Sequence, residues 1–589
     1  MEINNLHPAT FLRGVEIDRL CSDTTRSHTT MVCRFSVLIL AVAAFGICQA
    51  QERPYGRSMV VTPNGIVATS YVQASQAGAR ILERGGSAID AGIAANAVLG
   101  VAEPMMNGMG GDLFAIYWDA KTGKLYGLNA SGWAPKGLTI EHLRAKGVTE
   151  MPQKGIDSVT VPGAVDGWAK LHERFGKLPW ADLFKPAIFY ASNGYAVPEI
   201  IQGYWEEAAP GLKRDGESTR VYLPEDKAPE LGQIFSNAEL ARALTLVATR
   251  GEAAFYKGEI AEAILKTSTE LGGTMTADDL ASYSAEWVEP VSIDYRGWKV
   301  YELPPNGDGI AALEMLQIMG QFPAAADGPL SAAELHTRIE AMKLAYADVT
   351  RYDGDPRFST IPVTELLSNE FASSRAKLID PSHANCEVSP GALHGSDTTY
   401  LSVVDKDGNI LSLIQSNYDA FGSGVTVRGM GFVLQDRGGL FKLDAQSPDA
   451  LAGRKRPFHT IIPGFMERGT VHIGFGIMGG MNQPLAHAQF VSDVVDYHMN
   501  IEEALDTPRF TKHSVPKGVG CQITIESRVP ADVRQKLTQM GHQLDVRGAF
   551  STAMGRGQAV LTDTSKPAHY GASDPRADGS AEPEWPVIH

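Results

Sequence analysis

Cysteine is scarce in this sequence, and the motifs that hold metals with cysteine or histidine are missing. Three of the five cysteines fall within the first 50 residues, which leaves Cys386 and Cys521. Two cysteines so far apart in the chain do not make a disulfide framework. No His-Glu-x-x-His motif and no closely spaced Cys or His set occurs. We therefore expect scattered histidines, no metal site and no cofactor.

Positive charge is also in deficit. The 589 residues carry 52 Lys and Arg against 68 Asp and Glu, a formal net charge of −16. This balance repels nucleic acid and anionic membrane surfaces, so neither is an expected partner. With 44% hydrophobic and 20% charged residues, the composition is that of a globular protein. The length indicates two to four domain-sized units or one large interlocked α/β body.

No apolar run is comfortably long enough for a transmembrane helix, but a shorter one lies near the N-terminus. A basic segment at residues 31–34 precedes the mainly apolar residues 35–47, and small residues follow. This order is typical of a secretory signal peptide. We therefore expect residues 1–50 to be a leader, with the signal peptide at about 31–50. The mature protein would begin near Gln51 and be periplasmic or secreted.

Helix boundaries are clear in two parts of the chain. One helix is predicted to end at Gly85-Gly86, and a second to begin at Ser87, which has an acidic residue three positions later. Ser331 begins another helix with the same type of capping pattern. From Thr399 onward, strand-like segments alternate with Gly-rich turns.

The stretch "SDTTYLSVVDKDGN", residues 396–409, places Asp-Thr-Thr before a strand-like run. One explanation is ordinary, because Thr favours strands and Asp favours their ends. The alternative is a cut between Asp397 and Thr398, which follow a connector rich in Pro, Gly, Ser and His. The cut would free an α-amine that could take the proton of the Thr398 hydroxyl and make it a nucleophile.

The turn at Asp407-Gly408 provides a geometric test of this alternative. A two-residue turn would place Ser416 opposite Thr399, and a three-residue turn would place it opposite Thr398. In both cases the Ser416 hydroxyl would lie close enough to hydrogen-bond to that of Thr398. Ordinary Ser/Thr pairing in a sheet would give the same pattern.

A Gly-rich turn follows a strand-like run in "VHIGFGIMGGMNQPLAH", residues 471–487. Gly474, Gly476 and Gly479 match the G-x-G-x-x-G spacing of dinucleotide sites. That fingerprint needs a second strand after the helix, whereas the segment after this turn is helix-like throughout. The alternative is that the backbone N–H groups of Gly479 and Gly480 stabilise an oxyanion at a helix N-terminus, as acyl transfer requires.

These motifs resemble those of the γ-glutamyltranspeptidases, which are N-terminal-nucleophile hydrolases. The resemblance covers about residues 60–578 and includes "GGSAIDAGIAANAVLGVAEP", "NGMGGDLF", "VPGAVDGW", "EAMKLAYAD", "KRPFHTIIP" and "YGASDPRADG". It implies an α+β fold, an αββα sandwich made as one proenzyme. The proenzyme would cut itself into two interlocked subunits, a large one over residues 51–397 and a small one over residues 398–589.

The resemblance also implies roles for individual residues. Thr398 matches the catalytic threonine, and Asp397-Thr398 matches the bond that is cleaved. Ser416 matches a hydroxyl that supports the nucleophile. Gly479 and Gly480 match the glycines that bind the oxyanion.

The positions that read the substrate depart from the pattern of glutathione-using members. Ser131 stands where they hold the glutamyl α-carboxylate with an arginine. Leu440 replaces the acid that holds the α-ammonium. His459-Thr460 replaces a pair of hydroxyl residues that helps to bind the carboxylate. These departures resemble the divergent branch that includes cephalosporin-acylase-like and oxamate-amidohydrolase-like members.

Arg437 is the clearest candidate to compensate, because its guanidinium can bind a carboxylate through two hydrogen bonds. The alternative is a structural arginine paired with Asp436 or another acid. Gln483 and His487, four positions apart on the predicted helix, are expected to brace the loop rather than to react.

We therefore expect an amide hydrolase or acyltransferase that cleaves small γ-glutamyl or related carboxylated acyl amides through an acyl-threonine intermediate. The alternative is a non-catalytic binding or scaffold protein on the same fold. The intact Thr398, Ser416, Gly479 and Gly480 argue against it.

Overall fold

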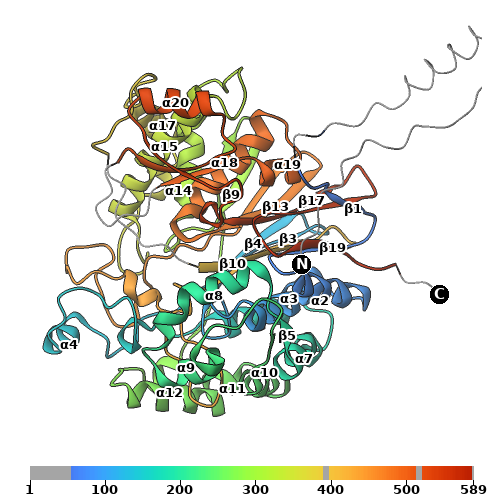
Figure 1. Ribbon diagram of the computed structural model, residues 1–589, viewed down its shortest axis with the longest axis vertical. Helices are drawn as coiled ribbons and strands as arrows, with labels where there is room; N and C mark the ends of the chain where they lie inside the picture. Colours follow the sequence, from blue (N-terminus) through green and yellow to red (C-terminus); the bar gives the residue numbers. More distant parts are fainter. Residues whose placement is uncertain (1–52, 54, 389–396, 513–519, 587–589) are drawn as a thin grey trace, which may run out of the picture. The chain divides into compact units, whose positions relative to one another are not determined.

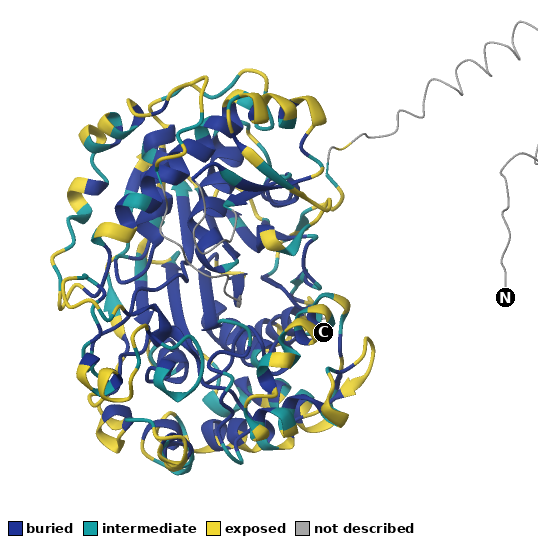
Figure 2. Ribbon diagram, turned by 60° about the vertical axis from the view of Figure 1, so that its left-hand side comes forward, coloured by how far each residue is buried: buried dark blue, intermediate teal, exposed yellow. Residues whose placement is uncertain are grey.

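Two seven-stranded β-sheets form the centre of the computed structural model, which describes residues 53, 55–388, 397–512 and 520–586. The predicted leader and signal peptide, residues 1–50, lie outside the described residues. Helices cover the outer faces of both sheets (Figures 1 and 2). The order of layers is therefore helix, sheet, sheet, helix, which confirms the expected αββα sandwich.

Neighbouring strands are antiparallel throughout both large sheets. The first sheet has the order β1 (Val60–Thr62), β18 (His569–Ser573), β17 (Arg556–Asp563), β13 (Val471–Met478), β12 (Gly464–Arg468), β9 (Trp298–Glu302), β8 (Val291–Tyr295). The second sheet has the order β19 (Ser580–Pro583), β2 (Ile66–Thr69), β10 (Asp397–Val404), β11 (Ile410–Tyr418), β3 (Asp112–Asp119), β4 (Lys124–Ala130), β7 (Glu286–Val288).

Two smaller sheets accompany them. Their strands are β14 (Phe510–Lys512), β15 (Gln522–Glu526) and β16 (Gln543–Arg547) in one, and β5 (Tyr195–Ala196) and β6 (Ile234–Phe235) in the other.

Each large sheet combines strands from both sides of the Asp397–Thr398 bond. Strands β1, β8 and β9 of the first sheet precede this bond, as do β2, β3, β4 and β7 of the second. About half of the central strands therefore lie in the part of the chain where the sequence pattern emphasised helices. The two parts could not separate without breaking both sheets.

The two helical layers have separate hydrophobic cores. The layer on the second sheet contains α2 (Val72–Glu83), α3 (Ala88–Ala102), α5 (Ala164–Phe175), α6 (Trp180–Leu183), α7 (Lys185–Asn193), α8 (Glu199–Leu212), α9 (Gly216–Tyr222), α10 (Ala238–Arg250), α11 (Ala253–Tyr256), α12 (Glu259–Glu270) and α13 (Ala277–Ala281). The layer on the first sheet contains α14 (Gly309–Met319), α15 (Ala332–Tyr352), α16 (Val363–Leu366), α17 (Asn369–Ala376), α18 (Gln483–Asp496), α19 (Ile501–Asp506) and α20 (Ala531–Gln539). The short α4 (Ile140–Ala145) packs in a small cluster of its own.

The predicted helix boundaries are confirmed. The Ser87 hydroxyl accepts the Asp90 N–H at 3.2 Å, and the Asp90 carboxylate accepts the Ser87 N–H at 2.9 Å. Ser331 caps α15 through the N–H of Glu334 at 3.3 Å. Residues 357–388 contain the short helices α16 and α17.

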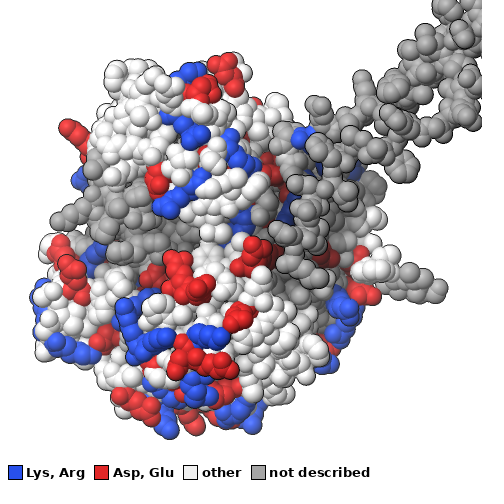
Figure 3. Space-filling view, viewed as in Figure 1, with Lys and Arg blue, Asp and Glu red and all other residues white. Residues whose placement is uncertain are grey.

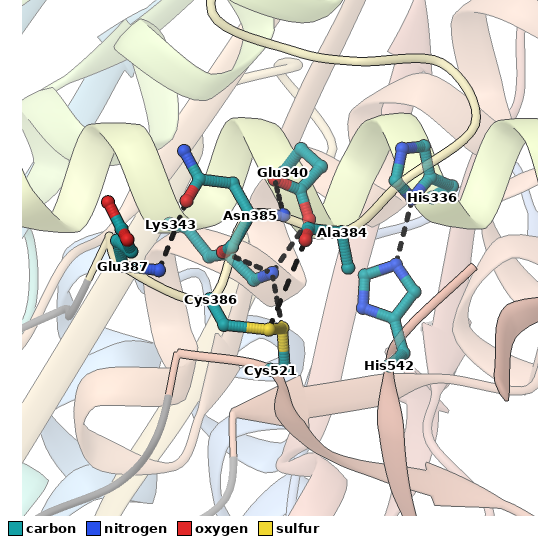
Figure 4. Close-up of a disulfide and its surroundings, with 9 residues drawn as sticks. All are labelled: His336, Glu340, Lys343, Ala384, Asn385, Cys386, Glu387, Cys521 and His542. Carbon is teal, nitrogen blue, oxygen red and sulfur yellow. Dashed lines mark hydrogen bonds and ion pairs between the residues drawn. A yellow bond between two sulfur atoms is a disulfide. The ribbon is translucent and has the colours of Figure 1, made fainter. Parts of the chain in front are cut away.

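The structure shows two features of cysteine and histidine that the sequence did not predict. Cys386 and Cys521 form a disulfide, with their Cα atoms 4.9 Å apart, because the fold brings these sequence-distant residues together. The histidines are not all scattered, since ligand atoms of His336, Glu340 and His542 lie within 4.8 Å of one another. The two imidazoles hydrogen-bond to each other at 2.8 Å, and Glu340 pairs with Lys343 at 2.7 Å. Figure 4 shows both features side by side.

The charged surface and the helices agree with the composition. Acidic and basic side chains intermingle on the face shown in Figure 3. Among the described residues, no helix combines the length and the apolar character needed to cross a membrane.

The two sheets approach closely where glycines of β13 face aromatic and aliphatic side chains of the hairpin β10–β11. A Cβ added at Gly476 would lie 2.4 Å from the Tyr400 ring, and one at Gly474 would lie 2.5 Å from the Ile410 side chain. These glycines therefore serve sheet packing. The dinucleotide alternative fails, because α18 and α19 follow β13 with no strand between them.

Replacing Gly476 by Ala should destabilise the protein by about 1–3 kcal/mol, because a methyl group cannot enter the packed contact with Tyr400 without moving it. Denaturant unfolding measures this change. Gly203→Ala is a matched control in α8, where an added Cβ meets nothing within 4 Å and Ala favours the helix. Equal stabilities of the two variants would show that the sheets can separate locally at no cost.

Candidate functional site

The hairpin β10–β11 places Thr398 beside Ser416. The Asp405 N–H donates to the Asn409 carbonyl at 3.0 Å, so a three-residue turn joins the strands, as in one of the two predicted registers. A bulge between Asp397 and Thr399 takes Thr398 out of the regular ladder. Its hydroxyl donates to the Ser416 hydroxyl at 3.2 Å. The predicted proximity of these two hydroxyl groups is thus confirmed.

Arg437 is held against these hydroxyl groups at the start of the 3-10 helix η4 (Arg437–Leu440). One nitrogen of its guanidinium donates to Ser416 Oγ at 3.1 Å, and another donates to Thr460 Oγ1 at 2.8 Å. The guanidinium carbon lies 4.3 Å from the centre of the Tyr418 ring. A full positive charge therefore lies one hydroxyl group away from Thr398.

The alternative pairing of Arg437 with Asp436 is not what the structure shows. Asp436 pairs with Lys154 at 2.9 Å, and within the described residues Arg437 forms no ion pair with a carboxylate. Yet the side chain is only 1% exposed. A buried guanidinium whose hydrogen bonds among the described residues go to neutral hydroxyl groups retains strong capacity to attract an anion.

Acids near Arg437 leave its charge only partly balanced. Burial raises the pKa of Asp112 to about 7 and that of Asp308 to about 8, although the charge of Arg437 opposes both shifts. Both carboxyl groups are therefore substantially protonated near neutral pH. Neither oxygen of Asp308 has a hydrogen-bond partner among the described residues.

Of the residues predicted to read the substrate, Thr460 joins Arg437 but His459 turns elsewhere. The His459 Nε2 lies 3.0 Å from Asp112 Oδ2, and its ring packs on Phe114. Burial, followed by the charges of Arg437 and Arg456, holds the pKa of His459 well below its usual range. The imidazole is therefore neutral and positioned by Asp112.

Ser131 lies in a neighbouring polar network. Its hydroxyl donates to Asn129 Oδ1 at 2.8 Å, and the Asn306 side-chain amide donates to Ser131 Oγ at 3.2 Å. Asn306 is linked onward, since its carbonyl accepts the His459 N–H at 2.7 Å. The structure thus connects Ser131 to the His459 backbone and does not bring it into direct contact with Arg437.

Gly479 and Gly480 follow the C-terminal end of β13, and β13 runs along β10 toward the end where β10 begins. Gly474 faces Ile410, the partner of Val404 at the far end of β10, whereas Gly476 faces Tyr400. Continuing in this direction, the turn after β13 comes to the Thr398 end of the hairpin. Gly479 and Gly480 have φ values of 141° and 59°, which favour glycine, and they lead into α18.

The predicted braces are in place. The Gln483 carbonyl oxygen accepts the Ile462 N–H at 3.1 Å. The His487 Nε2 accepts the Ile477 N–H at 3.1 Å, and its Nδ1 lies 2.8 Å from Glu302. Both side chains are buried; His487 holds the strand just before Gly479, and Gln483 ties the start of α18 to the segment before β12.

Sequence reasoning missed two acids of this site, Asp112 and Asp308. Asp112 occurs in the motif "NGMGGDLF" and Asp308 in "PPNGDG". Such Gly-rich surroundings are typical of exposed turns, so the sequence gave no sign that either carboxyl group is buried.

Comparison with known proteins finds relatives that match most of this chain. A family model described as gamma-glutamyltranspeptidase matches residues 74–584. The glutathione hydrolase-like YwrD proenzyme of Bacillus subtilis is 36% identical over 527 residues, covering 89% of this chain and 99% of the relative. The oxamate amidohydrolase proenzyme of Klebsiella pneumoniae is 32% identical over 532 residues, covering 88% and 98%.

Solved structures give the same result. The crystal structure of a cephalosporin acylase from Bacillus halodurans superposes with a TM-score of 0.83 at 40% identity, covering 92% of this chain and 99% of that one. The similarity thus extends over both helical layers and both large sheets.

Proposed function

Because this chain belongs to the γ-glutamyltranspeptidase family, we propose that it is an exported, self-processing amide hydrolase or acyltransferase with Thr398 as its nucleophile. The observation that carries the proposal is the group formed by Thr398, Ser416 and Arg437, in which a nucleophile candidate lies beside a buried cation that has no carboxylate partner among the described residues. No observation favours a non-catalytic scaffold. Export rests on the predicted signal peptide at about residues 31–50.

Self-processing uses the Thr398 hydroxyl first on its own chain. Its oxygen attacks the carbonyl carbon of Asp397, the C–N bond breaks, and the acyl group moves to the hydroxyl as an ester. Water then hydrolyses the ester, which leaves a carboxylate on Asp397 and a free α-amine on Thr398. Large and small subunits of the same precursor, residues 51–397 and 398–589, remain interlocked.

Turnover of a small-molecule amide repeats this chemistry on the substrate. The α-amine of Thr398 takes the hydroxyl proton as the oxygen attacks the amide carbonyl. Backbone N–H groups of Gly479 and Gly480 stabilise the oxyanion. The amine leaves with a proton, and water or another amine then releases the acyl group from Thr398. None of these steps calls for a cofactor.

Recognition of the acyl group is assigned to Arg437. Its guanidinium and the Thr460 hydroxyl would bind a substrate carboxylate. His459 would help to position the neighbouring backbone rather than contact the carboxylate. Leu440 is buried at 5% exposure and offers no charge to an α-ammonium. A desolvated ammonium without a partner is costly. The preferred acyl groups are therefore carboxylated and lack the amine, such as glutaryl or oxamyl.

Thr398→Ala should leave one folded, uncut and inactive chain, because the attacking oxygen is lost. Wild type should give chains of 347 and 192 residues with N-termini at Gln51 and Thr398. Intact-mass measurement and N-terminal sequencing of the exported protein test both cuts.

Thr398→Ser is the matched control, since it keeps the hydroxyl and should still process, though more slowly. Normal cutting of Thr398→Ala at this bond would assign the cut to another protease. A mature protein that retains residues 35–47 would contradict the signal peptide.

Arg437→Ala should lower kcat/KM for glutaryl or oxamyl amides by roughly tenfold or more, because ~1.4 kcal/mol of lost carboxylate binding corresponds to a factor of ten. Wild type should turn over these amides at least as well as γ-glutamyl amides. Amine release by the processed enzymes provides the measurement.

A neutral acyl amide is the internal control, because its kcat/KM should change little in Arg437→Ala. Arg437→Lys keeps the charge but loses the forked geometry. Its kcat/KM for carboxylated amides should therefore lie between those of wild type and Arg437→Ala. A strong wild-type preference for γ-glutamyl amides together with an unaffected Arg437→Ala would refute this assignment.

The affinity for carboxylated substrates should fall as pH rises. Asp112 and Asp308, with pKa values raised by burial to about 7 and about 8, are neutral below these values and anionic above them. Their negative charges would then compete with the substrate for Arg437. KM for a glutaryl amide should rise between pH 6 and 9, and that for a neutral amide should not. Asp308→Asn should weaken the rise, whereas identical profiles for both substrates would contradict it.

A further inference from the structure

The disulfide between Cys386 and Cys521 spans the bond at which the chain is proposed to be cut. Cys386 precedes Asp397, and Cys521 follows Thr398. Figure 4 shows the bond between a segment that runs beside α15 and the start of the β15 region. Before the cut it closes a loop within one chain, and after the cut its two sulfurs belong to different chains.

We propose that Cys386–Cys521 is a covalent link between the two mature subunits, installed before or during maturation and retained in the active enzyme. This proposal rests on the proposed cut at Asp397–Thr398, which turns an intrachain disulfide into an interchain one. The two cysteines would hold the subunits together and would take no part in the chemistry of Thr398.

The large-subunit side of the link is fixed by α15. The Asn385 N–H donates to a Glu340 carboxylate oxygen at 3.2 Å, and the Lys343 ammonium donates to the Asn385 carbonyl at 3.1 Å. Lys343 and Glu340 also pair with each other at 2.7 Å and are both buried. The residue before Cys386 is therefore anchored to a helix of its own subunit.

The small-subunit side approaches the same segment through its backbone. The Ala384 N–H donates to the Met540 carbonyl at 2.7 Å. A Cβ added at Gly520 would lie 2.3 Å from the Val388 carbonyl oxygen and 2.9 Å from that of Cys386. Only glycine allows this approach, so the position next to Cys521 is built to receive the Cys386 segment.

The surroundings also favour formation of the bond. The Lys343 nitrogen lies 3.9 Å from Cys521 Sγ, and a nearby cation favours the thiolate of a reduced cysteine. Cys521 is buried, whereas the Cys386 residue is exposed, so an external reagent would meet Cys386 first. An external disulfide would accept two electrons and two protons from the two thiols. The thiols would become one protein disulfide and the reagent two thiols.

The link adds something that shared sheets do not. Both large sheets contain strands of both subunits, and the contacts between these strands are lost together when the protein unfolds. A disulfide would then keep the two chains at high effective concentration and restrict the unfolded state. The expected result is a more stable enzyme whose catalytic site, built around Thr398, is unchanged.

Denaturing gel electrophoresis tests the link. The processed enzyme is purified without reductant and treated with an alkylating agent before it is denatured. Without reductant, one species should contain both chains; with dithiothreitol, it should separate into chains of 347 and 192 residues. Cys386→Ser should give the two chains without reductant. It should also lower Tm by several degrees and keep kcat/KM within about twofold of wild type.

Controls separate this proposal from the maturation on which it rests. Thr398→Ala should remain one chain with and without dithiothreitol. Two separate chains from wild type without reductant, with both thiols alkylated, would overturn the link and leave self-processing intact. A wild-type chain that stays whole after reduction would overturn the cut and, with it, the interchain link. Cys521→Ser should reproduce the gel pattern of Cys386→Ser, and chains that stay together in either variant would show that this disulfide is not what joins them.

Discussion

The close contact between the two large sheets at Gly474 and Gly476 is the constraint on which the site depends. Because the Tyr400 ring occupies the space where a Cβ of Gly476 would be, β10 and β13 have a single relative placement. The beginning of one strand and the end of the other then meet at one edge of the sandwich. Thr398 and the turn at Gly479 come from distant parts of the sequence, and this contact directs the ends of their two strands toward the same edge.

The charge of Arg437 is a second feature of the site. The Arg437 guanidinium is buried against Ser416, Thr460 and the Tyr418 ring, without a paired carboxylate among the described residues. Burial keeps nearby acids such as Asp308 largely protonated. An uncompensated cation in a low-dielectric site is costly for stability, and proteins retain such costs where a ligand offsets them. The proposed recognition of a substrate carboxylate would thus use a side chain whose burial is costly for stability.

The way in which strands are shared between the two parts of the chain explains how a cut at Asp397–Thr398 could leave the fold intact. Both large sheets contain strands from each side of this bond, so each part completes the hydrogen-bonded ladders of the other. The disulfide from Cys386 to Cys521 crosses the same boundary at the outer helical layer. The proposed cut would therefore change the connectivity near Thr398, while the packing that positions this residue would remain.

The sequence by itself determined the features that depend on local chemistry. Capping residues such as Ser87, the presence of a tight turn near Gly408 and the proximity of Thr398 and Ser416 are set by neighbours along the chain, so local rules find them. The disulfide, the partners of Arg437 and the burial of Asp112 were decided only by the tertiary structure. Each of these depends on which distant groups surround an atom, and the pattern of residues along one strand or turn carries no information about that environment.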